Sequence, residues 1–406
     1  MVPWVFSVCF LVFSVKIAAS EDPPCIIDLE CPECIPDNMP LVTSHRAVNG
    51  SVRAQSRDEV LLSCGGGKFL AFPLRTTLTA VCEAGRYRLH HDHSLRHLLE
   101  LGCQESVLED VLHQVEHCPP PLQGRAYQLQ VSAGRTRHLA LVCFDADRGR
   151  AERARAGRLT LAPHIDRAAP LTLLGNFNHM FDARTRRDAE RLYRDRASLN
   201  RRLQEILKHD RVSLAGQTLT SASLLAPHYF KDQEMRAADF VSNEVAVWRS
   251  VADGNLKHLR ADVARLLSLN RELEVHAGTH GVASLRGADN KRVELYLSAA
   301  RRFPVPLYVW TAVVDPVSHA GLALVLLNDP FVAVSEIREA VFCDSMCGRA
   351  AWLRELHRNR HYEVPLYGLV FCCELHNFTR TVPELPAALV QSVRRNEEGM
   401  LFGDFA

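Results

Sequence analysis

The sequence predicts a protein of the α+β class, in which a small disulfide-rich, strand-rich module precedes a larger domain of mixed sheet and helix. Three observations support this fold class. Short apolar runs alternate with Gly and Cys turns over residues 60–145, which is typical of strands. A helical periodicity extends over residues 182–210. After a second helical stretch at 256–269, further apolar runs have the length of strands.

The first 20 residues have the features of a secretory signal peptide. Residues 5–15 form an apolar run, and Ala18-Ala19-Ser20 supplies the small residues of a cleavage site. This run is shorter than the roughly 20 apolar residues of a membrane span, and no later stretch reaches that length. We therefore expect a protein that is secreted into the extracellular space and has no membrane partner.

Cysteine usage agrees with export. Without Cys9 of the signal, twelve cysteines remain, eight before residue 144 and four after residue 342. Two even-numbered groups predict disulfides that close within each region. Cys31-x-x-Cys34 has a zinc or redox interpretation as an alternative, but no second pair stands at finger spacing, so a disulfide is favoured. The sequons at Asn49 and Asn377 predict glycosylation.

The net charge is only +1, from 48 basic and 47 acidic residues, which excludes a global attraction to nucleic acid. Any basic surface must be local. The helical segment 182–210 holds nine basic and six acidic residues, and a solvated face with internal ion pairs is favoured there over a phosphate-binding surface. Neither this segment nor a denser arginine row before it has interleaved aromatics. That row is the better candidate for binding phosphate: Arg148, Arg150, Arg153, Arg155 and Arg158.

Residues 256–269 have apolar side chains on one helical face. Strands are expected at 274–275, 292–297, 307–314 and 321–327. We divide the chain into a signal peptide (1–20), a Cys-rich module (21–145) and a larger domain (146–406).

A series of short motifs follows residue 215. Each is weak alone, but their order and spacing carry information. They are Leu225-Ala226-Pro227, Arg236-Ala237, Asn243, Trp248, Gly254-Asn255, Ala277-Gly278-Thr279-His280-Gly281-Val282, the segments 304–310 and 342–347, Asn328-Asp329-Pro330, Cys372-Cys373-Glu374 and Leu385-Pro386.

This series resembles the DNA/RNA non-specific endonuclease family, and specifically its secreted insect branch. The early cysteine module is similar to the N-terminal extension of the insect proteins, so the resemblance covers nearly the whole mature chain. It implies a ββα-metal nuclease core. In such a core a histidine is the general base, an asparagine holds one divalent cation, a glutamate positions the metal-bound water, and arginines stabilise the developing charge.

The residue types that carry this chemistry are replaced here. Alignment through Leu-Ala-Pro places Leu224 at the histidine position and Ala222 at the arginine position. Counting from Asn243 places Ala252 at the metal-binding asparagine and Arg260 at the glutamate. A leucine cannot accept a proton, an alanine cannot ligate a cation, and an arginine repels one. The resemblance therefore predicts a pseudoenzyme without a cofactor.

Two polar positions remain open to interpretation. Asn243 is either a substrate contact or a structural amide at the turn before the helix. Arg260 is a second substrate-binding candidate, because a fixed guanidinium can hold a phosphate without hydrolysing it. Asn255, next to Gly254, is predicted to cap the following helix.

An alternative alignment retains catalysis. His228 lies four residues beyond Leu224, and an even slip along a strand keeps a side chain on the same face. Asp232 or Asp239 would then replace the lost ligands, and Mg²⁺ would be the cofactor. The sequence thus predicts a secreted nuclease-fold protein that binds a DNA or RNA backbone or another protein, with an active metal-dependent endonuclease as the alternative.

Overall fold

The computed structural model describes residues 22–48, 50–132, 134–157, 181, 183–194, 196–207, 214, 216–269, 272–287, 291–298, 300–359, 361–395 and 399–403. The expected signal peptide, Asn49 and Arg158 lie outside these residues. The described part combines several sheets with helices, which confirms the predicted α+β class. None of its helices is both long and apolar enough to cross a membrane.

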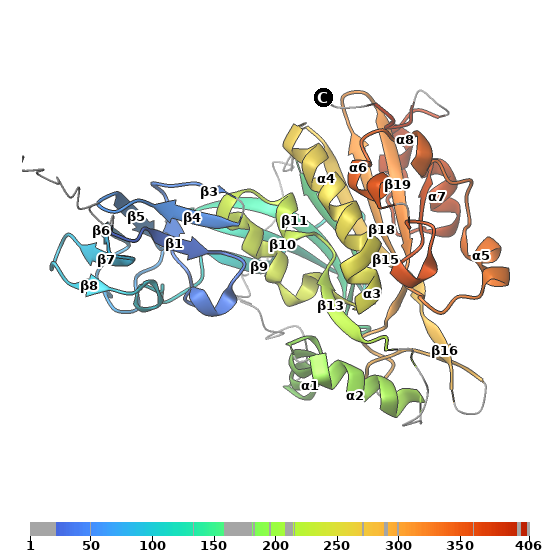
Figure 1. Cartoon of the computed structure of the whole chain (residues 1–406), viewed down its shortest axis with the longest axis horizontal. Coiled ribbons are helices and arrows are strands. Elements are labelled where there is room, and N and C mark those ends of the chain that lie inside the picture. Colours follow the sequence, from blue (N-terminus) through green and yellow to red (C-terminus); the bar gives the residue numbers. More distant parts are fainter. Residues whose placement is uncertain are drawn as a thin grey trace, which may run out of the picture.

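Two small sheets form one end of the molecule (Figure 1). The first has the order β1-β4-β3, and the second the order β2-β5-β6-β7-β8. Burial alternates along the longer strands, as expected for sheets with one face on a core. The strands are β1 (Cys25–Asp28), β2 (Leu41–Val42), β3 (Ala47–Val48), β4 (Ser51–Ala54), β5 (Glu59–Ser63), β6 (Thr77–Glu83), β7 (Arg86–Leu89) and β8 (Leu95–Arg96).

Disulfides close within each of the two cysteine groups, as the spacing predicts. The CxxC pair is itself bonded, which confirms its interpretation as a disulfide. The six bonds are Cys25–Cys82, Cys31–Cys34, Cys64–Cys103, Cys118–Cys143, Cys343–Cys373 and Cys347–Cys372.

A large antiparallel sheet organises the rest of the chain. Its order is β20-β19-β18-β15-β12-β11-β10-β9. The expected domain boundary at residue 145 falls inside this sheet, because β11 and β12 pair directly on either side of it. The strands are β9 (Leu108–Leu112), β10 (Gln123–Ser132), β11 (Arg135–Asp145), β12 (Arg150–Gly157), β15 (Glu274–Val282), β18 (Pro306–Asp315), β19 (Ala320–Leu327) and β20 (Val370–Cys373).

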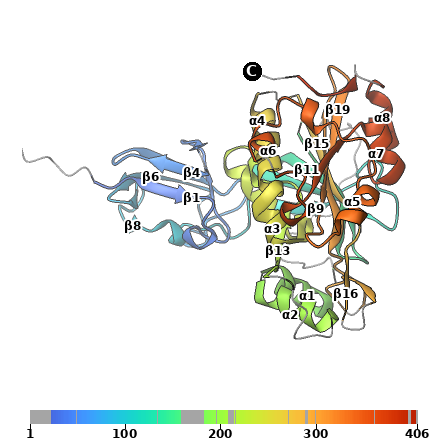
Figure 2. The same cartoon turned by 45° about the vertical axis from the view of Figure 1, so that its right-hand side comes forward.

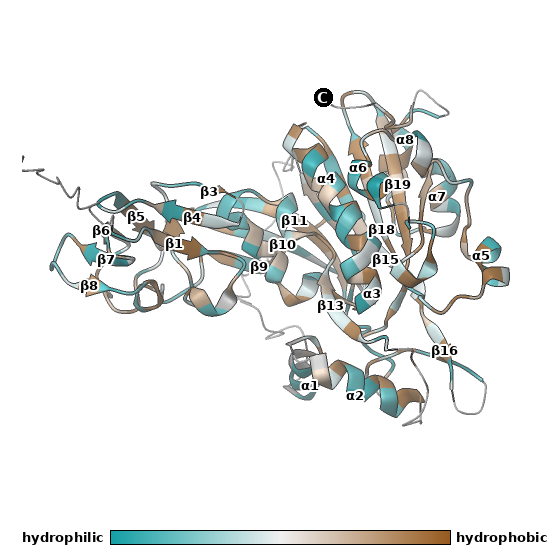
Figure 3. Cartoon of the chain, viewed as in Figure 1, coloured by the Kyte–Doolittle hydropathy of each residue, from teal (hydrophilic) through white to brown (hydrophobic). Residues whose placement is uncertain are grey.

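Different layers cover the two faces of this sheet. Val309 and Val313 of β18 face a core with α4 (Lys257–Leu269), whereas Trp310 faces a second core with α7 (Leu375–Thr381) and α8 (Ala387–Ser392). Figure 2 shows α4 and the α7–α8 pair on opposite sides of the sheet. In Figure 3 the central strands are strongly hydrophobic while the outer face of α4 is polar, so the sheet is the buried middle layer.

The helices agree in part with the sequence periodicity. The second predicted helix is present as α4, preceded by α3 (Arg249–Val251) and a kinked segment (Ala252–Leu256), in which Gly254 has non-helical φ and ψ angles. The segment predicted as a helix over 182–210 is helical over α1 (Ala183–Arg194) and α2 (Arg196–Leu207), and Asp195 between them lies outside the described residues. The shorter elements are β13 (Leu219–Ser223), β14 (Glu244–Trp248), β16 (Ser284–Arg286), β17 (Arg292–Glu294), α5 (Val334–Ala340), α6 (Arg354–Arg358) and 3₁₀ turns at Pro32–Cys34, Leu98–Glu100, Pro227–Tyr229, Asp232–Asp239, Val241–Asn243, Cys347–Arg349 and Pro365–Tyr367.

Candidate functional site

The strand β13 carries the first two positions of the nuclease-like motif. It pairs antiparallel with β14, and Ala222 lies opposite Val245. The strand ends at Ser223, after which the Leu224 amide donates to the Asn243 carbonyl at 2.7 Å. Ala222 is 9% exposed and Leu224 is 2% exposed. Both positions are therefore apolar parts of the core, with no group that could transfer a proton.

Asn243 is fully buried where β13 and β14 come together. Its Oδ1 accepts from the Leu225 amide at 2.9 Å, and its Nδ2 donates to the carbonyls of Leu225 (3.0 Å) and Ala238 (2.9 Å). Both amide protons are thus committed to the backbone. This geometry favours the structural interpretation of Asn243 over contact with a substrate.

Asn255 does not cap a helix, contrary to the prediction. It follows the kink at Gly254 and is fully buried, and its Nδ2 donates to the carbonyls of His361 (3.0 Å) and Gly368 (2.7 Å). Its Oδ1 accepts from Asn359 at 2.7 Å. The amide ties the start of α4 to a loop more than a hundred residues later, and local sequence contains no signal for such a contact.

The guanidinium of Arg260 reaches back from α4 to the end of β13. Its Nη2 donates to the Ser223 carbonyl, next to Leu224 in the chain. The structure therefore brings two of the aligned positions, Leu224 and Arg260, into one neighbourhood. Ala252 is half-buried before the kink at Gly254, and its side chain has no polar atom.

Burial dominates the electrostatics around Arg260. Desolvation lowers the pKa of Arg260, and the nearby Tyr229 opposes that shift. Burial also raises the pKa of Tyr229 to about 12, while the charge of Arg260 acts in the opposite direction. Tyr229 was not singled out from the sequence, because a tyrosine two residues after a proline carries no motif.

A divalent cation does not fit this arrangement. Its two aligned ligand positions offer a methyl group at Ala252 and a positive charge at Arg260, whereas Mg²⁺ requires oxygen ligands. No group of three His, Cys, Asp or Glu side chains with metal-binding geometry occurs in the described parts of the chain.

His228, the alternative general base, lies in a different environment from Leu224. It is exposed on the 3₁₀ turn Pro227–Tyr229, beyond the end of β13. The alternative alignment assumed a slip along a strand, but β13 ends at Ser223 and does not extend to His228. Asp232 and Asp239, the alternative ligands, are also exposed and stand at the two ends of the 3₁₀ helix Asp232–Asp239.

The arginine row that sequence favoured for binding phosphate is largely engaged within the protein. Arg148 and Arg150 lie 3.7 Å and 3.5 Å from carboxylates of Asp145 and Glu152. Arg155 donates to Glu274 at 2.5 Å. Asp145 lies three residues before Arg148, Glu152 lies on β12 itself, and Glu274 lies on the adjacent strand β15, so nearby acids supply all three contacts. This placement does not favour the row as a phosphate site.

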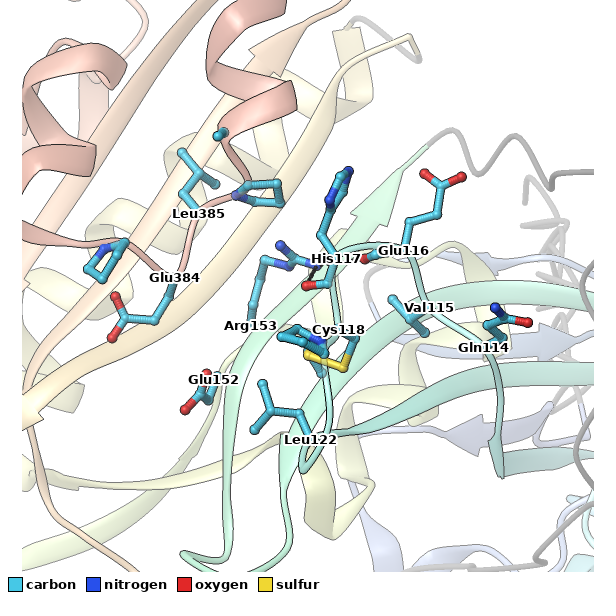
Figure 4. Close-up of a pocket in the computed structure, with 15 residues that line it drawn as sticks. Gln114, Val115, Glu116, His117, Cys118, Leu122, Glu152, Arg153, Glu384 and Leu385 are labelled. Carbon is cyan, nitrogen blue, oxygen red and sulfur yellow. Dashed lines mark hydrogen bonds between the residues drawn. A yellow bond between two sulfur atoms is a disulfide. The ribbon is translucent and has the colours of Figure 1, made fainter.

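Arg153 of that row enters a cavity of about 840 Å³ between residues 114–122 and the start of α8 (Figure 4). It donates to the carbonyls of Glu116 and His117 at 3.2 and 3.4 Å. Burial and the neighbouring Arg155 lower the pKa of Arg153 to about 10, although Glu152 opposes them. Three carboxylates line this cavity, those of Glu116, Glu152 and Glu384, and they outnumber the one guanidinium of Arg153.

Comparisons with known proteins give a distant likeness only. No protein-family model matches the chain. The salivary protein Tsal1 of Glossina morsitans morsitans is 28% identical over 173 residues, which are 42% of this chain and 40% of that protein's length. A solved complex of EndoG with EndoGI, titled for the mechanism of EndoG inhibition, gives a TM-score of 0.33 at 12% identity over 66% of this chain and 88% of that one. A TM-score this low supports no functional inference.

Proposed function

We propose that this protein is an exported, catalytically inactive relative of the DNA/RNA non-specific endonucleases that acts by binding nucleic acid. One observation carries the proposal: the buried guanidinium of Arg260 stands at the Ser223 carbonyl, where the resemblance would place the metal-positioning carboxylate. A cation and a guanidinium repel each other strongly at such short range. The position therefore holds a permanent positive charge of the protein's own.

The loss of hydrolysis follows from the chemistry of the side chains. Leu224 offers no general base and Ala222 no positive charge for a transition state. Ala252 offers no metal ligand. A phosphodiester at this place would meet neither an activated water nor a metal, so we expect binding without cleavage.

Export is supported by the disulfides and by the likeness to a salivary protein. Six disulfides are typical of a protein made for an oxidising environment. The relative Tsal1 is named as a salivary protein, which also supports export. We propose that residues 1–20 direct secretion and that Asn49 and Asn377 are glycosylated.

The second candidate function is a protein-binding scaffold. The two forms of binding respond differently to salt. Binding to a phosphate backbone weakens steeply as salt rises, since it releases condensed counterions. A protein interface with an apolar centre does not show that dependence.

The decisive experiment is cleavage of single- and double-stranded DNA and RNA by the purified mature protein, with Mg²⁺, Mn²⁺ or a chelator. We expect no cleavage in any of these conditions. His228→Ala is the matched control, because His228 is exposed and its loss should not affect folding. Cation-dependent cleavage that disappears in His228→Ala would instead establish an active nuclease with rearranged residues.

A further inference from the structure

A second cavity, of about 530 Å³, lies between α1 and α2 on one side and residues 297–298 and 300–302 on the other. Its charge is opposite to that of the cavity beside Arg153. Two carboxylates, Asp188 and Glu205, face five arginines that come from α1, α2 and the distant turn: Arg184, Arg191, Arg201, Arg202 and Arg302. We refer to it as the arginine cavity.

The walls of the arginine cavity are tied together by side-chain hydrogen bonds. Arg202 of α2 donates through Nε to the Leu297 carbonyl at 3.2 Å. In the opposite direction, Arg302 donates through Nη1 to Thr185 Oγ1 on α1 at 3.0 Å. These two bonds cross from helix to turn and from turn to helix, so they fix the distance between the walls.

The turn is also anchored in the core. Phe303 is fully buried, and its amide donates to the Arg148 carbonyl at 2.7 Å. Its ring lies against Gly149, where a Cβ atom would come within 2.4 Å of it. Tyr193 of α1 packs on the same ring with a centroid distance of 6.0 Å. Phe303 therefore anchors both α1 and the turn to the core.

The helix α2 contacts β13, the strand that leads to the nuclease-like site. Asn200 of α2 accepts from the Leu219 amide at 2.9 Å and donates to the Leu219 carbonyl at 3.3 Å. Leu219 begins the strand whose far end contacts Arg260. A chain-like ligand in the arginine cavity would thus lie one strand away from the former catalytic position.

Part of the positive charge in the arginine cavity is not neutralised. Arg202 is paired with Glu205 at 2.7 Å. Arg191 and Arg201 are exposed, and neither makes an ion pair with another residue that the structure describes. Arg191 of α1 and Arg201 of α2 line the same cavity.

We propose that the arginine cavity is the site at which this protein grips the phosphodiester backbone of a nucleic acid, an inference that rests on the proposed function of nucleic-acid binding. Guanidinium groups match phosphate oxygens with paired hydrogen bonds. No described residue lining the cavity is aromatic, so the recognition is of the backbone and not of stacked bases. The binding is therefore insensitive to base sequence.

The test is a titration of a fluorescently labelled DNA duplex by anisotropy at a series of salt concentrations. Arg191→Ala/Arg201→Ala is compared with Arg249→Ala/Arg358→Ala, which removes the same charge from two exposed arginines elsewhere. We expect the cavity variant to lose about tenfold in affinity or more. The slope of log K against log salt should fall by about 2. The control should change little, and both variants should keep the wild-type Tm.

The outcomes separate the inference from the proposed function. If the wild type binds the duplex and the two double variants weaken it equally, the arginine cavity is not the site, while nucleic-acid binding stands. If the wild type does not bind the duplex even at low salt, the inference and the proposed function both fail. A selective loss in the cavity variant, restored in part by Arg191→Lys/Arg201→Lys, supports the inference.

Discussion

The Arg260 side chain donates a hydrogen bond to the backbone carbonyl of Ser223 and so links α4 to the end of β13. Here a guanidinium joins them directly. The contact is a direct side-chain link between the helix and the end of the strand.

Arg260→Met should destabilise the fold, because it leaves the Ser223 carbonyl without its donor while keeping most of the apolar stem. We expect a loss of about 1–3 kcal/mol in the free energy of unfolding. Arg260→Glu should cost more, since a buried carboxylate would face that carbonyl oxygen. Chemical denaturation of both variants checks the order. Equal stability of Arg260→Glu and wild type in the presence of Mg²⁺ would show that a metal site survives.

Asn243→Ala should be among the most destabilising single substitutions in the chain. It removes three hydrogen bonds and leaves buried backbone groups of Leu225 and Ala238 unsatisfied. We expect a loss of more than about 3 kcal/mol. Asn38→Ala is the control, because its side chain makes one exposed bond to the Gln104 carbonyl. A substrate-binding role for Asn243 would instead leave stability unchanged and weaken binding to nucleic acid.

The buried ion pair of Arg125 and Asp110 joins the beginning of the large sheet to the site region. Their Nε–Oδ1 distance is 2.8 Å, and Ser242, the residue before Asn243, donates to the other carboxylate oxygen at 2.7 Å. Removing one partner leaves a buried charge alone. Arg125→Met should therefore cost about 3–5 kcal/mol.

Replacing both partners in Arg125→Met/Asp110→Leu removes the buried charges together. The double variant should be more stable than Arg125→Met alone. A double-mutant cycle measured by urea unfolding gives the coupling between the two groups. Strictly additive losses would show that the pair contributes no interaction energy.

His276 should make the protein sensitive to mild acid. Burial lowers the pKa of His276 to about 4, with the nearby arginines adding to the effect and Glu274 opposing it. The folded state thus favours the neutral ring, whereas the unfolded chain takes up a proton near pH 6.5. Stability from this group is complete above pH 6.5 and is lost as the pH falls toward 4, by up to about 3 kcal/mol.

His276→Gln should remove this part of the acid dependence. We expect its Tm to fall less than that of the wild type between pH 7 and pH 5. His228→Gln is the matched control, because that histidine is exposed and should follow the wild type. Parallel pH profiles for His276→Gln and wild type would show that other groups carry the acid sensitivity.

Sequence reasoning succeeded where the signal is local. The apolar repeat at 256–269 gave α4 within one residue, and the strands expected at 307–314 and 321–327 are present as β18 and β19. It was less accurate at 292–297, where β17 ends at Glu294.

The charge clusters were the harder problem. The row from Arg148 to Arg155 is dense in sequence, but β12 is a central strand, so carboxylates and carbonyls of neighbouring segments engage it. In the helical segment 182–210, acidic residues are interspersed among the basic ones, so its net positive charge in the sequence is small. Folding nevertheless directs arginines from two helices and a turn a hundred residues later into one cavity.

By itself, the sequence determined the fold class, the grouping of the disulfides and the absence of catalytic side-chain types at the aligned positions. These are properties of residue identity and short-range periodicity, which each segment carries alone. Only the tertiary structure decided that Arg260 would contact Ser223 and that the Asn243 side chain would hydrogen-bond to backbone groups. It also decided that Arg191 and Arg201 would line the same cavity. The physical reason is that such contacts depend on how distant segments pack, and packing is a property of the whole chain.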